Sequence, residues 1–99
     1  MDILDGLQDW YLSMCNGDWE HTYGIKIENI DNPGWAVTVE LMDTPLYQVK
    51  FDAIEIQRAE ENDWTLCRVE DGIFKGDCGP RNLKEVLRIF LEFASQVAK

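Results

Sequence analysis

The side chains best suited to nucleophilic or metal chemistry in this sequence are three cysteines and a single histidine. Cys15 lies six residues before His21, so the two could form a Cys–His pair or contribute to a zinc site. Zinc usually takes several Cys or His ligands, and a Cys–His pair needs a third group that orients the imidazole. We therefore expect neither function here. Instead, His21 and Asp18 are predicted to hydrogen-bond backbone groups where the chain leaves its first helix.

Cys78 precedes Gly79, Pro80 and Arg81 at the predicted start of the last helix. In the loops of phosphatases and sulfurtransferases, a thiolate lies among backbone N–H groups at such a place. Those loops contain several glycines and an arginine further along, whereas Arg81 follows Cys78 by three positions and Pro80 has no N–H. Cys78 is therefore expected to be structural. The cysteine spacings of 52 and 11 residues also fit neither a disulfide framework nor a CxxC metal site, which predicts reduced thiols.

Other signatures of catalysis or cofactor binding are absent from the sequence. It contains no DxDxDG-like calcium loop, no glycine-rich phosphate loop and no nucleophile elbow. We predict no catalytic residue, no metal ligand and no cofactor. Two alternatives stay open: a small cysteine-dependent enzyme, sulfurtransferase-like and using Cys78 or Cys15 with His21, and a regulatory module with an enclosed pocket for a small ligand.

The charge of the chain is strongly negative and unevenly distributed. Nineteen acidic and nine basic residues give a net charge of -10. Residues 1–79 hold seventeen of the acids and five of the bases, whereas residues 80–99 hold four bases and two acids. Such a field repels nucleic acids and anionic membranes and speeds encounter with a basic protein, although it also serves solubility alone. The sequence has no basic signal-peptide start and no apolar run of about 18 residues, which predicts a cytoplasmic protein.

Two tryptophans stand beside acidic residues at predicted junctions between loops and regular structure. Trp19 lies between two acids, and Trp64 follows an acidic turn. A large ring surrounded by charges is typical of an interface anchor, because the ring supplies buried area and the charges select and steer the partner. The alternative is that both rings pack into a small core. The predicted partner-binding surface consists of Asp18, Trp19, Glu20, Glu60, Glu61, Asp63 and Trp64.

These side chains must be positioned by helices at the two ends of the chain and strands between them. Apolar residues at helical spacing predict an amphipathic helix over 2–15, with Asp2 as its N-cap. Apolar and polar residues alternate over 23–28 and 35–41, which predicts a hairpin. The connecting sequence Asp-Asn-Pro-Gly at 31–34 favours a type II turn.

The rest of the chain predicts further strands and a second helix. Alternation over 46–58 changes parity at positions 52 and 53, which predicts a strand with a bulge or bend. A strand over 64–69 and a short one at 73–74 follow, and Asn82 with Glu85 forms a capping pattern that opens the last helix. The predicted fold is α+β: one domain over residues 1–99, an antiparallel meander of about five strands, and amphipathic N- and C-terminal helices packed on it.

Two blocks of the sequence resemble the immunity protein 53 family of bacterial polymorphic toxin systems. The block over 7–35 contains the motifs NGDWEH and DNPGW, and the block over 64–93 contains VEDG, Gly-Pro and FLEF. The resemblance implies an intracellular immunity protein that binds and neutralises a cognate toxin without turnover or a cofactor. It also supports the layout of helix, sheet and helix. Together with the excess of acidic residues over 1–79, the resemblance suggests a basic target such as a nuclease domain.

Overall fold

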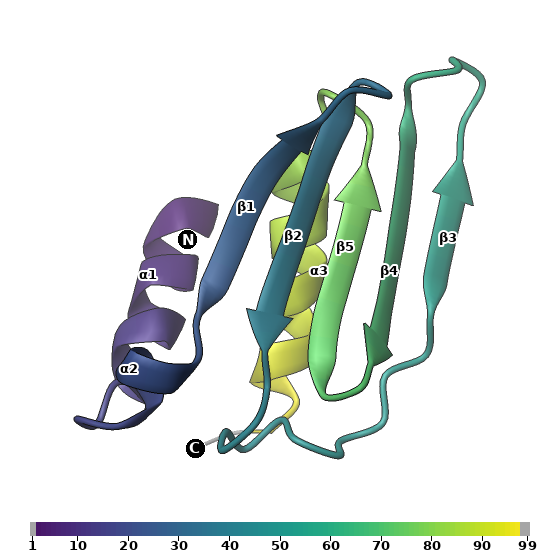
Figure 1. The fold of residues 1–99 in the computed structure, drawn as a ribbon. Coiled ribbons are helices and arrows are strands. Elements are labelled where there is room, and N and C mark those ends of the chain that lie inside the picture. The colour runs from purple at the N-terminus through teal and green to yellow at the C-terminus, as the bar shows by residue number, and fades with distance from the viewer. Residues whose placement is uncertain (1, 98–99) are drawn as a thin grey trace.

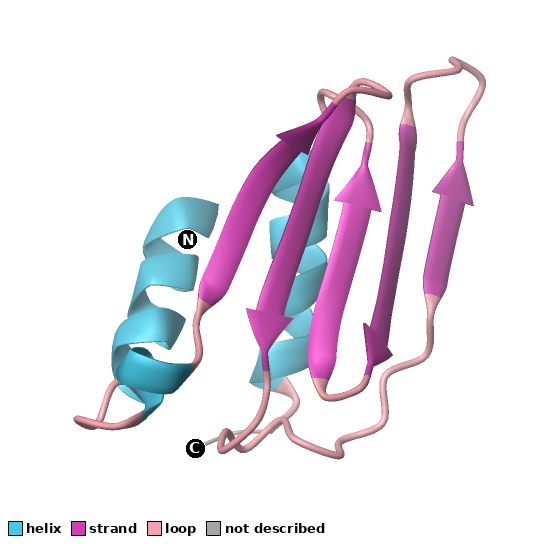
Figure 2. Cartoon of the chain, in the orientation of Figure 1, coloured by secondary structure: helices cyan, strands magenta, loops and turns pink. Residues whose placement is uncertain are grey.

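The computed structural model describes residues 2–97, which form three helices and five strands. Figure 1 shows their arrangement and Figure 2 their type. The elements in chain order are α1 (Ile3–Met14), α2 (Trp19–Thr22), β1 (Ile25–Ile30), β2 (Gly34–Glu40), β3 (Ile54–Gln57), β4 (Trp64–Glu70), β5 (Ile73–Cys78) and α3 (Leu83–Ser95). The predicted α+β class, with helices toward both ends of the chain, is confirmed.

The five strands form one open antiparallel sheet in the order β1-β2-β5-β4-β3. The hairpin β1–β2 and the run β3–β4–β5 are each made of neighbours in sequence, and β5 joins them by pairing with β2. Helix α3 lies behind the sheet in Figure 1 and contacts β4 and β5, while α1 lies next to β1 and contacts α3. Both helices therefore leave the opposite face of the sheet without a helical cover.

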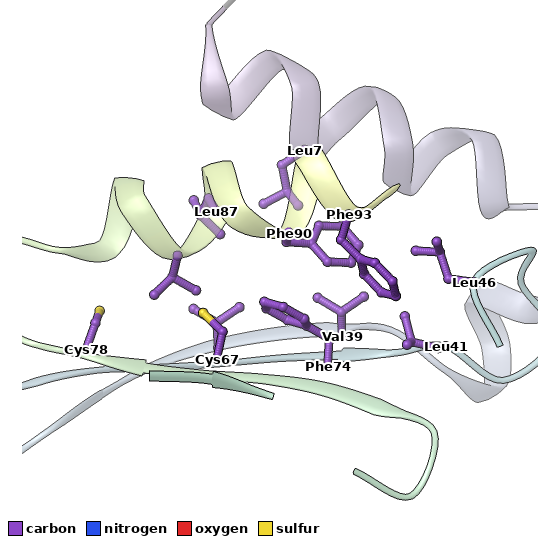
Figure 3. Packing of buried hydrophobic residues seen from close by; sticks show 12 residues of the cluster. Leu7, Val39, Leu41, Leu46, Cys67, Phe74, Cys78, Leu87, Phe90 and Phe93 are labelled. Atoms are coloured by element: carbon purple, nitrogen blue, oxygen red, sulfur yellow. The ribbon is translucent and has the colours of Figure 1, made fainter. Parts of the chain in front are cut away.

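The hydrophobic core fills the space between α3 and the sheet, as Figure 3 shows. The Phe74 ring on β5 lies 5.2 Å from the Phe90 ring on α3, centroid to centroid, in an edge-to-face arrangement. Gly76 allows the close approach of the helix, because a Cβ at this position would overlap Cγ1 of Val86. The apolar stripe of α3 therefore meets the alternating apolar residues of the central strands.

The segment between β2 and β3 differs from the prediction of a bulged strand. Residues 46–53 form turns and loop, and the strand begins only at Ile54. Thr44 fixes the first turn, because its hydroxyl donates to the Leu41 carbonyl at 2.8 Å and accepts from the Leu46 N–H at 3.1 Å. The side chain of Leu46, 1% exposed, then enters the core. Val49 and Phe51 pack against the core as well, whereas Tyr47 is 40% exposed, so these apolar residues follow turns and do not extend along a sheet.

The turn between β1 and β2 also departs from the prediction. The hairpin itself is confirmed, with Ile30 paired to Gly34 across residues 31–33. The Asn32–Pro33 peptide bond is cis, and Gly34 begins β2 without the positive φ that a type II turn requires, so the turn is not the type II turn that the sequence favoured. At the start of the chain, Asp2 is the N-cap as predicted, since its carboxylate accepts from the Leu4 N–H at 3.1 Å.

Candidate partner-binding surface

Trp19, the first predicted anchor, is a packed residue in this structure. Its side chain is 2% exposed, and its indole Nε1 donates to the Met42 carbonyl at 3.0 Å. Its ring lies 6.0 Å from those of Trp10 and Tyr11 and 6.4 Å from that of Tyr23. Trp19 therefore joins α1, α2 and the loop after β2, and the alternative of core packing describes it better than that of an exposed anchor.

The acid that follows Trp19 in sequence closes the loop between α1 and α2. The carboxylate of Glu20 accepts from the N–H groups of Asn16 at 2.9 Å and Gly17 at 2.8 Å. Hydrogen bonds from backbone N–H groups, its own first and then those of Asn16 and Gly17, hold the pKa of Glu20 below its ordinary value. Gly17 has a φ of 95°, which suits glycine at this reversal of the chain.

The predicted roles of Asp18 and His21 in this loop were wrong. Asp18 makes no side-chain capping bond to α2, and among the hydrogen bonds of residues 2–97 none involves the His21 ring. Asn16 supplies the side-chain acceptor instead, because its Oδ1 accepts from the N–H groups of Asp18 at 2.9 Å and Trp19 at 3.0 Å. The side-chain amide of Asn16 therefore makes the backbone hydrogen bonds that were predicted for the Asp18 carboxylate.

The second predicted cluster lies at the tip of the β3–β4 hairpin, residues 58–63. Glu60 and Glu61 are exposed there, and Asp63 is half-buried. Trp64 begins β4 and is also half-buried. An open hollow of about 550 Å³ separates this tip from the start of α3, lined by Glu60, Asn62, Asp63, Pro80, Arg81 and Asn82. This cluster therefore remains at the surface.

A group of polar side chains, here called the hairpin clamp, fastens the tip to α3. Arg58 donates to both carboxylate oxygens of Glu85, at 3.0 and 2.6 Å, and to Asp63 at 3.1 Å. Thr65 donates to Glu85 at 2.7 Å, and the Asn82 amide donates to Asp63 at 2.9 Å. The Arg58 hydrogen bonds, assisted by Thr65, lower the pKa of Glu85 to about 2. Glu85 is therefore a carboxylate over the whole neutral range.

The clamp corrects the predicted capping box of α3. The side chain of Asn82 makes no capping bond, although the residue stands at the N-cap, and Glu85 turns to Arg58. The motif marked the start of the helix correctly, but its two side chains bind the hairpin. Arg58 was missed by the sequence reasoning, since no local pattern links it to a residue 27 positions away.

The two predicted clusters are not brought together. Figure 1 places α2 at one end of the sheet, beside the start of β1, and the β3–β4 tip at the other end and on the opposite edge. A partner could touch Glu60, Glu61 and Trp64 at once, but the cluster around Trp19 belongs to a different corner. Their role in binding stays a prediction.

The uncovered side of the sheet, here called the open face, is a further surface that the sequence reasoning did not assemble. Its residues alternate with core residues such as Val37, Phe74 and Cys67, so their side chains point away from α3. By register they are Lys26, Glu28 and Ile30 of β1, Ala36, Thr38 and Glu40 of β2, Ile73, Lys75 and Asp77 of β5, Trp64, Leu66, Arg68 and Glu70 of β4, and Glu55 and Gln57 of β3. Strand periodicity separates the two faces within β1 and β2, but the pairing of β2 with β5 was needed to join them to β4 and β3.

Ion pairs cross the centre of the open face. Arg68 lies 3.5 Å from Asp77 and 3.7 Å from Glu70, and Lys75 lies 2.9 Å from Glu70. The hydrogen bond from Lys75, followed by the charges of Lys75 and Arg68, lowers the pKa of Glu70. These pairs are part-exposed, so they organise side chains more than they stabilise the fold.

The thiols are poorly placed for nucleophilic chemistry. Cys67 and Cys78 are 0% exposed on the core side of β4 and β5 (Figure 3), and burial raises their pKa values to about 12 and about 11. The half-buried Cys15 donates its S–H to the Tyr11 carbonyl at 3.3 Å. Within residues 2–97, no group of three or more His, Cys, Asp or Glu side chains is placed to hold a metal ion.

Nearly the whole fold is covered by the match to a protein family. Residues 4–95 match the family model described as Immunity protein 53. Searches of the curated proteins and of the solved structures gave no match. Over the part of the chain that the structure describes, no helix has the length and apolar character needed to cross a membrane. Because the family match runs from the second residue of α1 to the last residue of α3, the chain belongs to the immunity protein 53 family.

Proposed function

We propose that this protein is the antidote of a bacterial polymorphic toxin system and neutralises its cognate toxin by binding it in the cytoplasm. Membership of the immunity protein 53 family is the observation that carries the proposal. Binding alone requires neither turnover nor a cofactor. The half-exposed Trp64 and the exposed carboxylates of the β3–β4 tip are surface groups of the kind that a partner could contact.

The charge of the chain supports a basic toxin domain as the target. A net charge of -10 on 99 residues sets up a field that attracts a positively charged protein from beyond contact distance. Toxins that cleave nucleic acids need basic surfaces to hold the phosphate backbone. A nuclease domain is therefore the target class we propose, with the acidic protein covering the phosphate path.

Co-expression tests the function directly. Each neighbouring open reading frame is expressed alone and then together with this protein, and growth and co-purification are scored. The expected result is one neighbour that arrests growth alone, is tolerated in the presence of this protein and elutes with it as a complex. Rescue without a complex, or the absence of any toxic neighbour, would contradict neutralisation by binding.

Salt dependence tests the class of target separately. Raising the ionic strength from about 0.01 M to about 1 M shortens the Debye length from about 30 Å to about 3 Å. Association with a basic toxin should therefore slow steeply over this range. An association rate that does not change with salt would remove the basic target and leave the immunity function in place.

The cysteine-dependent enzyme is the rival class that substitutions separate from a binder. Burial and the raised pKa values of Cys67 and Cys78 disfavour thiolates at neutral pH. Alanine substitutions of Cys15, His21 and Cys78 should each preserve growth rescue as long as the variant folds. Loss of rescue in a folded variant of one of these residues, with complex formation intact, would favour the enzyme.

A further inference from the structure

We infer that the toxin docks on the open face, with Trp64 and Leu66 at the apolar centre of the contact and surrounding carboxylates meeting Lys or Arg side chains of the toxin. The inference rests on the proposed function and adds the surface and the chemistry of its partner. It commits to a basic protein domain as the occupant.

The open face retains apolar side chains that lie outside the core. Trp64, Leu66 and Ile73 are half-buried, yet none belongs to the core cluster or to the residues packed against it. The indole N–H groups of Trp19 and Trp35 donate to backbone carbonyls, whereas no hydrogen bond within residues 2–97 uses the indole N–H of Trp10 or Trp64. Trp10 packs against the core, while Trp64 lies outside it and offers a partner both apolar area and a donor.

The same face carries more acidic than basic side chains. Arg68 and Lys75 are already paired with carboxylates. Three further carboxylates of the face, those of Glu28, Glu40 and Glu55, form no ion pair within residues 2–97. Lys26 is the one cation of the face without an ion pair in the same range. The face therefore presents unneutralised negative charge around an apolar centre, which is complementary to a basic partner.

The opposite side of the molecule carries the wrong sign of charge for such a partner over α3. Lys84 and Arg88 are exposed on this helix, against one exposed acid, Glu92. A groove between α1 and α3 has a volume of about 320 Å³ and is lined by Gly6, Asp9, Trp10, Leu91, Ala94 and Ser95. This groove is the alternative docking site for the toxin, and Asp9 in its lining allows it to be tested.

The size of the open face sets the extent of the contact. Strands spaced about 4.8 Å apart and rising about 3.3 Å per residue give five strands a flat area of roughly 450 Å². A standard interface covers about 800 Å² on each partner. The β3–β4 tip continues from Trp64 with the exposed Glu60 and Glu61, so a contact of this size can extend from the open face onto the tip. A second copy of this chain is disfavoured on the same face, because two copies would each bring a charge of -10.

The test compares two charge-reversed variants with the same change in net charge, each in complex with the toxin identified by co-expression. Glu28→Lys with Glu55→Lys alters exposed positions on the two edge strands of the open face. Asp9→Lys with Glu92→Lys alters exposed positions on α1 and α3, the first of them lining the groove. Because both pairs change the net charge equally, long-range attraction falls equally, and only local contacts distinguish them.

We expect the open-face pair to raise the dissociation constant about tenfold or more, and the helix pair to raise it about threefold or less. Folding of both variants is checked by circular dichroism and urea unfolding. The pair Glu28→Gln with Glu55→Gln is measured beside them, because it removes the charges without adding longer side chains, and it should weaken binding in the same direction.

Three outcomes overturn the inference. A helix pair that weakens binding more than the open-face pair places the toxin on the α1–α3 groove. Equal weakening by both pairs reduces the effect to net charge. Failure of the wild-type protein to bind any neighbouring toxin contradicts the proposed function, and with it this inference, so the two failures are distinguishable.

Discussion

The corner around Trp19 and the tip around Trp64 have the same composition in sequence and opposite places in the structure. Each tryptophan stands beside acidic residues at a junction between loop and regular structure. Trp19 is 2% exposed and surrounded by three aromatic rings, whereas Trp64 is half-buried on the open face and outside the core. The same local composition therefore occurs around a tryptophan buried between elements and around a tryptophan that remains at the surface.

The acids beside the two tryptophans differ in their contacts, which explains why the same composition has two different roles. Glu20 uses both carboxylate oxygens to bind backbone N–H groups of its own loop. Glu60 and Glu61 are exposed, and neither forms an ion pair within residues 2–97. A carboxylate that closes a loop is committed before any partner arrives, while a solvated one remains free to select a partner.

Replacement of each tryptophan by alanine gives the largest expected contrast. Trp19→Ala should lower the free energy of unfolding by about 3 to 5 kcal/mol, because it empties a buried aromatic site and removes the donor to the Met42 carbonyl. Trp64→Ala should cost roughly 1 kcal/mol, since the ring is outside the core, yet it should weaken toxin binding. Urea unfolding and binding measured on both variants check this; equal losses of stability would abolish the distinction.

The hairpin clamp sharpens the comparison, because it ties part of the exposed tip to α3. Glu85→Ala removes the partner of Arg58 and Thr65 and should lower the free energy of unfolding by about 2 kcal/mol. Glu92→Ala, at an exposed position of the same helix, is the matched control and should change it by about 0.5 kcal/mol or less. Similar values for the two variants in urea unfolding would mean that the clamp contributes nothing.

The clamp also predicts a defined dependence on pH. The pKa of Glu85 is about 2 in the folded protein, against 4.5 as its ordinary value. A lowered pKa means that the clamp stabilises the fold fully above pH 4.5 and loses this effect as the pH falls toward 2. The difference in free energy of unfolding between wild type and Glu85→Gln should therefore be constant near neutral pH and shrink over that window. A difference that stays constant down to pH 2 would contradict the ionised clamp.

Much of the fold was predictable, because the apolar residues of its helices and of most of its strands recur at the spacing typical of each structure. Two places were not. Tyr47, Val49 and Phe51 alternate as in a strand, but the chain turns here, so that Leu46 enters the core and Tyr47 is 40% exposed. Strand β5 extends to Cys78 through Gly76 and Asp77, beyond the short strand at 73–74 that the sequence predicted. Gly76 is required there by Val86 of α3, a contact that only tertiary packing reveals.

The candidate surface was predictable only in part, because residue type and local spacing do not indicate contacts between residues far apart in sequence. Residue type and local spacing located the tip with Glu60, Glu61 and Trp64 at the surface. They could not show that the ring of Trp19 fills a space between elements, or that Arg58 reaches across 27 positions to Glu85. The open face depends on the pairing of β2 with β5, and long-range register leaves little trace in a single sequence.

The smallest expected effect separates the two acids that flank Trp19. Glu20→Gln keeps the size of the side chain but replaces one of the two oxygens that accept from Asn16 and Gly17, so the thermal midpoint should fall by a few degrees. Asp18→Asn should leave it unchanged, because the Asp18 side chain makes no capping bond to α2. Thermal unfolding followed by tryptophan fluorescence measures both. A larger loss for Asp18→Asn would return the loop-closing role to the residue that the sequence first suggested, and would leave Glu20 free to face a partner as the acids of the tip do.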